Sequence, residues 1–333
     1  MRMQFPNPAP PQGTLQITVS KAISVIKKAQ PDITPQELSH ITLPNPVTYY
    51  YMFTRKSGPL KGNAYLIDPY SARISPPQQL SSYFIAKVIS FHLNLMAGAK
   101  GVLASGIFAF FAIFTLLSGL WLWWPSTMRQ LKLRLSIKRH APLRRTLTDL
   151  HNIFGISLYL LLLLTTVTTV VMVYNSYTKG GLIKAIDGTT TEKQLSVVSK
   201  GKRLPDDVLI ARLHQQYPNF NILFIDRPQH ATDVLRARFE QKGYGLLRWG
   251  YLEMNPYSGN ILIDQDSTAP AGQKSMALIT DLHAGRFGGI WVKVLYTVTG
   301  IMPLGLFITG LLVWWKRKQA ERKAKIRRQQ LFV

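Results

Sequence analysis

The amino-acid sequence predicts a mixed fold, in which an α-helical membrane bundle of three spans carries two small α+β modules. The first observation behind this prediction is three uncharged apolar runs, each long enough to cross a bilayer, which takes roughly 20 residues. The second is a cluster of basic residues directly after two of these runs. The third is an alternation of apolar and polar residues in the remaining stretches, which is typical of half-buried strands.

The three apolar runs fit membrane-spanning helices in both length and flanking residues. They are Gly101–Trp124, Ile153–Tyr174 and Val294–Trp315, and none contains Lys, Arg, Asp or Glu. The first and third runs end in a pair of tryptophans, a residue type enriched where a span meets the lipid head groups. The alternative is a buried helix of a soluble protein, but the uniformity of these runs favours the membrane.

The net charge of +24 would by itself suggest a nucleic-acid partner, but its distribution argues against one. Seven Lys and Arg residues lie between Ser126 and Arg145, and eight more lie between Lys316 and Arg328. Both clusters follow Trp-capped runs, as expected of cytoplasmic flanks that also touch anionic lipid. We therefore expect membrane lipid as a partner and no nucleic acid. The absence of cysteine excludes disulfides, Cys-ligated zinc and iron–sulfur clusters.

The basic clusters also orient the chain across the membrane. The first span is expected to run inward, the second outward and the third inward, so that both modules lie outside. The residues ahead of the first span contain no apolar segment that would carry them across a membrane. We therefore expect a further span upstream of the residues in this chain.

These observations divide the chain into seven segments. They are residues 1–80 (first module), 81–125 (first membrane helix, with His92), 126–150 (basic cytoplasmic loop), 151–176 (second membrane helix), 177–275 (second module), 276–316 (third membrane helix, with His283) and 317–333 (basic cytoplasmic tail).

The two modules repeat one order of elements. The expected elements are helices at Val19–Lys28 and Asp207–Gln216 and strands near Thr48–Thr54, Asn63–Ile67, Asn221–Ile225, Asp233–Phe239 and Tyr251–Met254. Each module closes with an Asx-Pro-Tyr-Ser turn, at residues 68–71 and 255–258, where the Asx side chain and the proline set the geometry. Internal duplication in membrane proteins often brackets a site at the interface of the repeats.

The membrane segments repeat as well, and the repeat contains histidine. His92 and His283 each precede the last Trp of their span by thirty-two residues, and a glycine follows each six residues later, Gly98 and Gly289. At 1.5 Å per residue, two similarly straight helices would hold these histidines at one height, near the outer face. Two neutral imidazoles on adjacent helices supply both axial positions of a six-coordinate haem. The pattern therefore predicts a metal or, better, a haem between the spans.

Neighbouring residues suit the same cofactor. Gly98 and Gly289 would allow close approach of a flat macrocycle, and Lys100 and Arg286 would pair with haem propionates. Zinc is less well served, because it takes three or four close ligands and no carboxylate cluster accompanies these histidines. No protease, hydrolase or P-loop motif is present, and no soluble nicotinamide or flavin domain is apparent.

The other histidines differ in how well their positions suit haem binding. His151 lies at the opposite, inner face, just ahead of the second span, and only His140 offers a histidine partner there. We expect His140 to be solvated in its basic loop, so that an inner-face haem would be absent or weak unless an upstream span supplies a ligand. We interpret the remaining three as ordinary histidines of the modules without partners: His40, His214 and His230.

Three stretches of sequence carry a resemblance to a known family. They are FHLNLMAGAKG with SGLWLWWP, LRRTLTDLHNIFG, and DLHAGRFGGIWVKVLYTVTGIMPLGLFITGLLVWWKRK. Together they resemble the PepSY-associated transmembrane proteins, often called iron-regulated membrane proteins, over nearly the whole chain. Some members resemble ferrioxamine reductase and act as inner-membrane ferric-siderophore reductases with b-type haem between paired histidines.

The resemblance implies a specific set of roles. By it, His92 and His283 match the outer-face haem ligands, His151 matches an inner-side ligand, and the modules resemble periplasmic PepSY modules. Family members usually begin with a further span that carries a histidine, which would give four spans in all. The implied protein is a multi-pass oxidoreductase of the bacterial inner membrane. Its partners would be a ferric siderophore or other iron chelate, and quinol or a cytoplasmic electron donor.

Other functions remain open. The modules would bind peptide or a protease if the protein were a membrane-anchored regulatory protein without redox activity, but anchoring requires no matched histidines. A small-molecule permease is weakly suggested by Pro303 and by the threonines of the second span. Substrate docking on Tyr49, Tyr50, Tyr51 and Arg55, or on Arg236, Arg238, Tyr244 and Arg248, competes with a plain strand surface at those positions.

Overall fold

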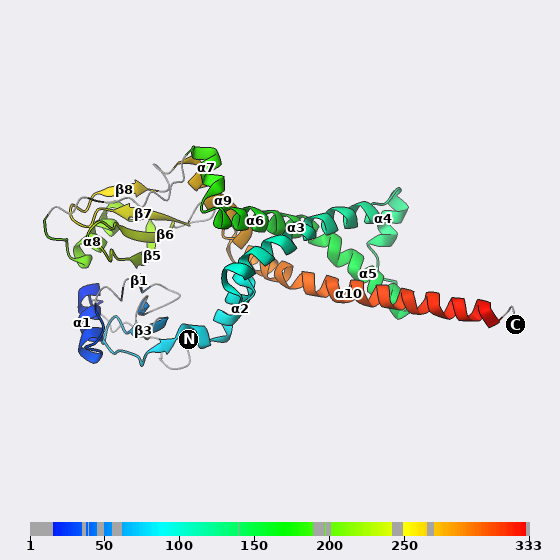
Figure 1. Cartoon of the computed structure of the whole chain (residues 1–333), viewed down its shortest axis with the longest axis horizontal. Coiled ribbons are helices and arrows are strands. Elements are labelled where there is room, and N and C mark those ends of the chain that lie inside the picture. Colours follow the sequence, from blue (N-terminus) through cyan, green and yellow to red (C-terminus); the bar gives the residue numbers. More distant parts are fainter. Residues whose placement is uncertain are drawn as a thin grey trace. The chain divides into compact units, whose positions relative to one another are not determined.

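The computed structural model describes the chain as two compact units. The described residues are 16–34, 38, 40–44, 50–54, 62–138, 140–188, 197, 201–241, 249–264 and 270–330. The first unit, here the sheet unit, comprises residues 1–105 and 172–281, and the second, the helical unit, comprises residues 106–171 and 282–333. Figure 1 shows the elements of both units.

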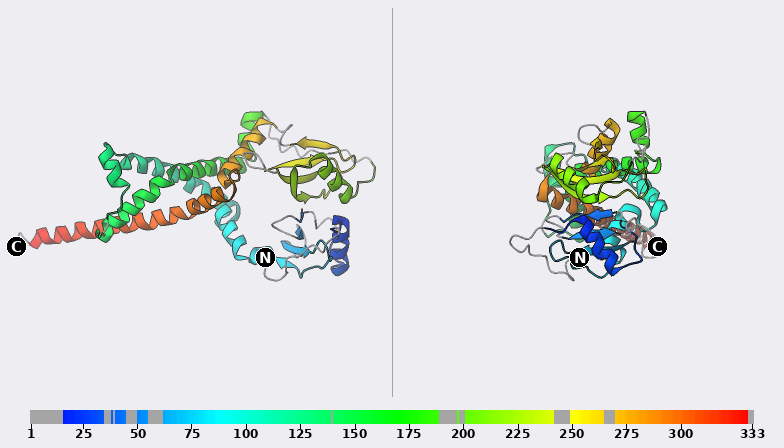
Figure 2. Two further views of the ribbon diagram at one scale, coloured as in Figure 1. Left: turned by 180° about the vertical axis from the view of Figure 1, so that it is seen from behind. Right: turned by 90° about the vertical axis from the view of Figure 1, so that its left-hand side faces the viewer.

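The described strands of the sheet unit form one antiparallel sheet in the order β4-β3-β2-β1-β5-β6-β7-β8 (Figures 1 and 2). The strands are β1 (His40–Thr42), β2 (Tyr51–Thr54), β3 (Asn63–Ile67), β4 (Gln78–Gln79), β5 (Phe220–Asp226), β6 (Leu235–Gln241), β7 (Trp249–Met254) and β8 (Ile261–Asp264). A 3₁₀ turn at Leu80–Ser82 follows β4. The sequence predicted five of these strands and missed β1, β4 and β8. Strands β1 and β4 are too short for an alternating pattern to be visible.

The two halves of the sheet come from the two predicted modules, and β1 joins them. Within β1, Ile41 lies opposite Ile225 of β5, and Leu43 just beyond donates its backbone N–H to the carbonyl of Leu223 at 2.8 Å. The strands that the sequence divides between two modules therefore share one sheet in the structure.

Helices α1 (Val19–Ala29) and α8 (Asp206–Gln216) pack on one face of this sheet, in agreement with the predicted helices to within one residue at each end. Thr18 caps α1 by accepting from the N–H of Lys21 at 3.2 Å, and Asp207 accepts from the N–H of Ser20 at 3.1 Å. The core is a single apolar cluster. Its fully buried side chains include Ile26, Leu38, Ile41, Phe53, Tyr65, Ile67, Leu209, Leu213, Ile225, Leu235 and Leu252.

The Asx-Pro-Tyr-Ser turn predicted for both modules is present twice with one geometry. The Oδ1 of Asp68 accepts from the N–H of Tyr70 at 2.8 Å, and the Oδ1 of Asn255 accepts from the N–H of Tyr257 at 2.9 Å. The residue directly after each turn has a left-handed backbone, Ala72 (φ 58°) after the first and Gly259 (φ 75°) after the second. The duplication seen in the sequence therefore extends to individual hydrogen bonds.

Each matched histidine lies on a helix of its own, ahead of its span. His92 is on α2 (Phe84–Asn94), which ends before α3 (Gly98–Trp123), and His283 is on α9 (Ala271–Ala284), which ends before α10 (Gly289–Gln330). The sequence predicted that each histidine lies on or just ahead of a membrane helix. In the structure the backbone turns left-handed at Gly98 (φ 59°) and Gly289 (φ 63°), which separates the histidine helix from the span in both repeats.

The middle of the chain is also more divided than expected. Helix α4 (Met128–Arg134) lies in the basic loop, α5 (Leu143–Ser157) carries His151, and α6 (Tyr159–Tyr177) is the second span. A turn at Leu158 separates α5 from α6, so the second span begins later than the predicted Ile153. Helix α7 (Gly181–Asp187) follows and belongs to the sheet unit.

Within the described residues, three helices are long and apolar enough to cross a membrane, as predicted. They are Gly98–Trp123, Tyr159–Tyr177 and the part of α10 over Gly289–Ala324. Only 6, 11 and 6% of their most apolar windows are buried inside the protein, so their side chains face outward. Apolar surface of this extent is unfavourable in water, and the protein is therefore a membrane protein whose spans contact lipid.

Candidate cofactor site

His151 is held against the third span inside the helical unit. Its Nδ1 lies 3.0 Å from the Oγ1 of Thr309 on α10. Gly310 lies beside the ring, and a methyl group there would make ordinary van der Waals contact with the Cε1 of His151 at 3.5 Å. Helix α5 packs along α10 at this point, and Gly155 lies against Leu306 in the same contact. A histidine of the helix before the second span therefore packs against the third span near Gly310.

The environment of His151 favours a neutral imidazole. Burial lowers the pKa of His151, because desolvation disfavours the charged ring, and the backbone of Leu306 opposes that shift in part. A neutral imidazole is the form that binds metals.

His283 makes a matching contact with the second span. Its Nδ1 lies 3.0 Å from the Oγ1 of Thr168, a side chain of α6 that is only 5% exposed. Tyr296 of α10 donates its hydroxyl to the carbonyl of Leu282 at 2.5 Å and so ties the end of α9 to the start of the third span. Seventeen residues separate His151 from Thr168 in the chain, so the two histidine contacts lie at different levels of the helical unit.

His92 is an exposed side chain near the C-terminal end of α2. It belongs to the sheet unit, whereas His283 belongs to the helical unit, so the predicted pairing of these two histidines stays a prediction. The six-residue spacing between histidine and glycine in the two repeats does have a structural counterpart. In both repeats a left-handed glycine follows the histidine by six residues, Gly98 after His92 and Gly289 after His283.

The structure gives these two glycines a backbone role. Both open a span with a positive φ, a conformation that strains residues with a Cβ, and this alone accounts for glycine at both positions. Lys100 is exposed in the first turn of α3, and Arg286 is half-buried between α9 and α10. Contact of any of the four with a haem stays a prediction.

Two histidines that were predicted to lack partners have carboxylate partners. The Nδ1 of His40 lies 2.8 Å from the Oδ1 of Asp226, across the strand pair that joins the two halves of the sheet. The Nδ1 of His230 lies 3.1 Å from the Oδ2 of Asp233 in an exposed turn. That part of the prediction is wrong, because β1 was not recognised and because His230 and Asp233 close one turn. His140 is exposed, as expected.

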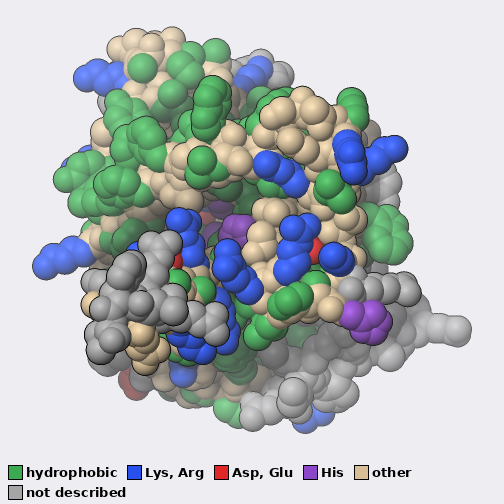
Figure 3. Space-filling view, turned by 90° about the vertical axis from the view of Figure 1, so that its right-hand side faces the viewer, with side chains coloured by type: hydrophobic (Ala, Val, Ile, Leu, Met, Phe, Trp, Pro, Cys, Tyr) green, Lys and Arg blue, Asp and Glu red, His purple; other side chains and the backbone are tan. Residues whose placement is uncertain are grey.

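Basic side chains cluster at the end of the helical unit where α4, α5 and the C-terminal part of α10 lie, and Figure 3 shows them from that side. Asp149 is a buried acid there, with 1% exposure; it forms an ion pair with Arg145 at 2.9 Å and accepts from the N–H of Lys138 at 3.3 Å. Arg134 donates to the carbonyl of Trp123 and so caps the first span. These contacts order the basic loop without neutralising its charge.

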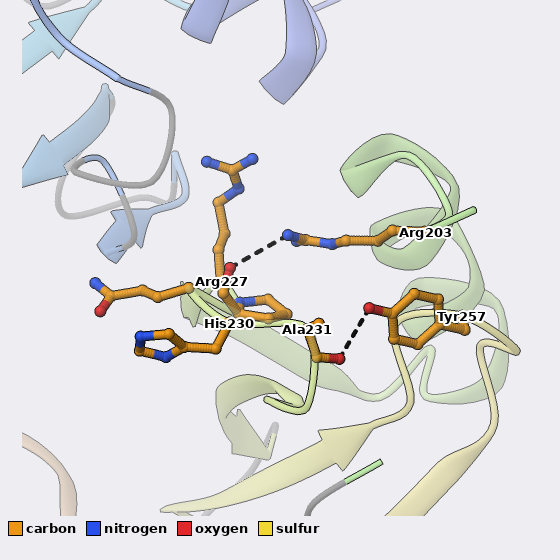
Figure 4. Close-up of a pocket in the computed structure, with 7 residues that line it drawn as sticks. Arg203, Arg227, His230, Ala231 and Tyr257 are labelled. Carbon is orange, nitrogen blue, oxygen red and sulfur yellow. Dashed lines mark hydrogen bonds between the residues drawn. The ribbon is translucent and has the colours of Figure 1, made fainter. Parts of the chain in front are cut away.

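A cavity of about 200 Å³ opens beside α8 in the sheet unit (Figure 4). It is lined by Arg203, Arg227, Pro228, Gln229, His230, Ala231 and Tyr257. Both arginines approach one buried carboxylate, since Arg203 and Arg227 lie 2.8 and 2.7 Å from the two oxygens of Asp206. Arg203 also donates to the carbonyl of Pro228, as the dashed line in Figure 4 indicates. This network fixes the start of α8 to the β5–β6 connection.

The docking residues suggested by the sequence are mostly engaged within the fold. Tyr50 and Tyr51 are buried, with 8 and 6% exposure, and Tyr51 donates to the carbonyl of Ile17 at 2.7 Å. Arg236 donates to the buried carboxylate of Glu253 at 2.9 Å, and Arg238 lies over the ring of Phe224. The other four lie outside the described residues: Tyr49, Arg55, Tyr244 and Arg248.

Together, three apolar spans and an antiparallel sheet define a mixed α/β membrane protein. A family model for the PepSY-associated TM region matches residues 2–317, so the chain belongs to that family. The resemblance carried by the three histidine-bearing motifs is thereby confirmed. No curated protein matches the chain.

Proposed function

We propose that this protein carries electrons across the bacterial cytoplasmic membrane through haem b and reduces ferric complexes, such as ferric siderophores, on the periplasmic side. The observation that supports this proposal is the pair of histidines in the helical unit. His151 and His283 are each held through Nδ1 by a threonine of another helix, at two different levels of the helical unit. Membership of a family associated with iron-regulated membrane proteins agrees with it.

The residues present fit a haem. Neutral imidazole is a haem ligand, and in this proposal each ring contacts its threonine through Nδ1 and would bind haem iron through Nε2. In this proposal His92 and His283 hold an outer-face haem, while His151 supplies one ligand of an inner-face haem. Lys100 and Arg286 would pair with propionates. Bound haem b would supply a one-electron carrier at the outer face, and a second one at the inner face where a further ligand joins His151.

The protein's own side chains position the ligands and exclude water. The buried Thr168 and the packing of α5 on α10 keep both rings inside the helical unit. The substrate is a ferric ion in a hard oxygen chelate. One electron, taken from quinol or from a cytoplasmic donor, converts it to ferrous iron, which such a chelator holds less tightly.

A reduced-minus-oxidised absorption spectrum tests the proposal. Protein purified after expression with haem supplied should show a Soret and an α-band, and each of His92→Ala and His283→Ala should abolish the same outer-face haem. His214→Ala is the matched control, because His214 lies on α8 of the sheet unit, and its spectrum should be unchanged. A wild-type protein without these bands would refute haem binding, and loss of pigment in only one of the two variants would refute a shared site.

The alternative function makes the opposite prediction. If the protein is a membrane-anchored regulatory protein that binds peptide through its sheet unit, no histidine variant should alter a spectrum. Peptide binding would then survive His92→Ala and His283→Ala, whereas ferric reduction would be absent from the wild type.

A further inference from the structure

We propose that Thr168 and Thr309 are positioning residues that hold His283 and His151 in the tautomer with the proton on Nδ1 and the lone pair on Nε2. The inference goes one step beyond the haem sites, and in its consequence for the cofactor it rests on the proposed function. The tautomer itself is a property of the protein alone, and it can be measured without any haem.

The hydroxyl geometry carries the argument. Thr168 Oγ1 lies 2.8 Å from the carbonyl oxygen of Leu164 and 3.0 Å from that of Thr165, both on its own helix. A hydroxyl has one proton, and two carbonyls compete for it. With that proton committed to the helix, Oγ1 presents a lone pair to the imidazole, so the Nδ1 of His283 must be the donor across their 3.0 Å contact.

Thr309 repeats this geometry at the other histidine. Its Oγ1 lies 2.8 Å from the carbonyl oxygen of Gly305 and 3.1 Å from that of Leu306, and 3.0 Å from the Nδ1 of His151. Two independent contacts, on different helices and at different histidines, thus assign the same proton to the same ring nitrogen. A neutral imidazole that donates from Nδ1 keeps its lone pair on Nε2, and the donated hydrogen bond makes Nε2 a stronger base.

The two contacts are exchanged between two helical segments. The α5–α6 segment supplies His151 to one contact and Thr168 to the other, while the α9–α10 segment supplies His283 and Thr309. Each segment therefore orients the ligand of its partner. A rotation of either segment would disturb the contacts of both histidines. The orientation of the two segments relative to each other therefore decides whether His151 and His283 can act as ligands.

A purely structural explanation competes with this one. Threonine and histidine also form hydrogen bonds between membrane helices simply to hold them together. In that case the hydroxyl would be as able to donate to Nδ1 as to accept from it, and the histidine tautomer would be unspecified. The position of the ring proton distinguishes the two explanations.

Nitrogen-15 NMR of haem-free protein labelled at histidine in nanodiscs locates that proton. His151→Gln and His283→Gln assign the two rings. We expect both rings of the wild type to be protonated at Nδ1 at neutral pH. Thr168→Val should move His283 to a mixture of tautomers and leave His151 unchanged, and Thr309→Val should do the reverse. Thr168→Ser and Thr309→Ser, which keep the hydroxyl, should restore the wild-type spectra.

Two other threonines are matched controls. Thr169 and Thr299 donate to the carbonyls of Thr165 and Leu295 on their own helices, each at 2.8 Å. Thr169→Val and Thr299→Val should leave both tautomers unchanged. Protonation of His283 or His151 at Nε2 in the wild type, or valine variants that match the controls, would overturn the proposal.

A second measurement separates this proposal from the proposed function. In haem-loaded protein, Thr168→Val should weaken haem binding by about 10- to 100-fold and raise the midpoint potential, because the ligand becomes a poorer donor. If the wild type binds no haem, the proposed function fails and the NMR result still decides the tautomer. If the wild type binds haem and Thr168→Val matches Thr169→Val in both affinity and potential, the positioning role fails and the proposed function stands.

Discussion

Ala72 and Gly259 occupy one position of the duplicated turn with different side chains. Both have a left-handed backbone, in which a Cβ costs about 1–2 kcal/mol. Ala72→Gly should therefore raise the free energy of unfolding by about 0.5–1 kcal/mol, since the greater freedom of glycine in the unfolded chain cancels part of the gain. Thermal unfolding of the purified protein measures this, and a fall in the melting temperature would contradict it.

The opposite change at the second turn is the control. In Gly259→Ala the new methyl group would overlap the guanidinium of Arg212, which donates to the carbonyl of Ser258 at 2.7 Å. This variant should lose stability by about 1 kcal/mol or more, because strain and overlap add. If both substitutions changed the melting temperature in the same direction, the two turns would not be equivalent.

Tyr51 makes the sheet unit sensitive to alkali. Burial raises the pKa of Tyr51 to about 12, and the charge of Asp207 adds to that shift. A raised pKa in the folded state means that stability is fully present below pH 10 and is lost as the pH rises through about 12, because only the unfolded chain releases this proton early. Tyrosinate absorbance should show a component that titrates near pH 12 and is absent from Tyr51→Phe, and a titration complete near pH 10 would contradict the burial.

At the scale of elements, Asp206 anchors the start of α8. Its carboxylate is 9% exposed and balances Arg203 and Arg227, which are 29 and 12% exposed. Asp206→Asn would leave two arginines without their charge partner in a largely buried place, and we expect a loss of about 3 kcal/mol in unfolding free energy. Glu321→Gln, which breaks exposed ion pairs with Arg317 and Lys318 on α10, should leave the melting temperature nearly unchanged. Similar melting temperatures for the two variants would contradict a stabilising role of the buried Asp206.

The elements also show where sequence reasoning succeeds and where it stops. Long apolar runs and amphipathic helices such as α1 are visible because their pattern extends over several turns. Strand β1 is only three residues long, and its partner β5 lies far along the chain, so no local pattern reveals it. The breaks at Gly98 and Gly289 are likewise decided by backbone conformation, although the matched glycines had marked the positions.

The candidate site was likewise predicted from the sequence only in part. The histidines were found because a repeated residue type at a repeated spacing is visible in a single sequence. Thr168 and Thr309 were missed, because a threonine that bonds to its own helix looks like any other threonine of a span. Their register with histidines on other helices depends on packing, and packing is what the structure adds.

At the scale of the whole molecule, the basic clusters predict its orientation. Reporter fusions after Gln130 and after Lys318 should lie in the cytoplasm, and a fusion near Gly243 should lie outside, because positive flanks stay on the cytoplasmic side. Alkaline phosphatase and green fluorescent protein fusions report the two sides. The reverse pattern would invert the electron path and remove the proposed function.

The strand pair β1–β5 has a consequence for how the protein is made. Strand β1 is synthesised before the first span, and the strand that covers its edge follows the second span. Until then the N-terminal half-sheet has an unpaired edge, open to pairing with the wrong chain. Completion of the sheet must therefore wait for two membrane insertions, and pairings so distant in sequence form slowly. During biogenesis this protein should need a chaperone on the side where its sheet assembles, and its yield should fall when that chaperone is depleted.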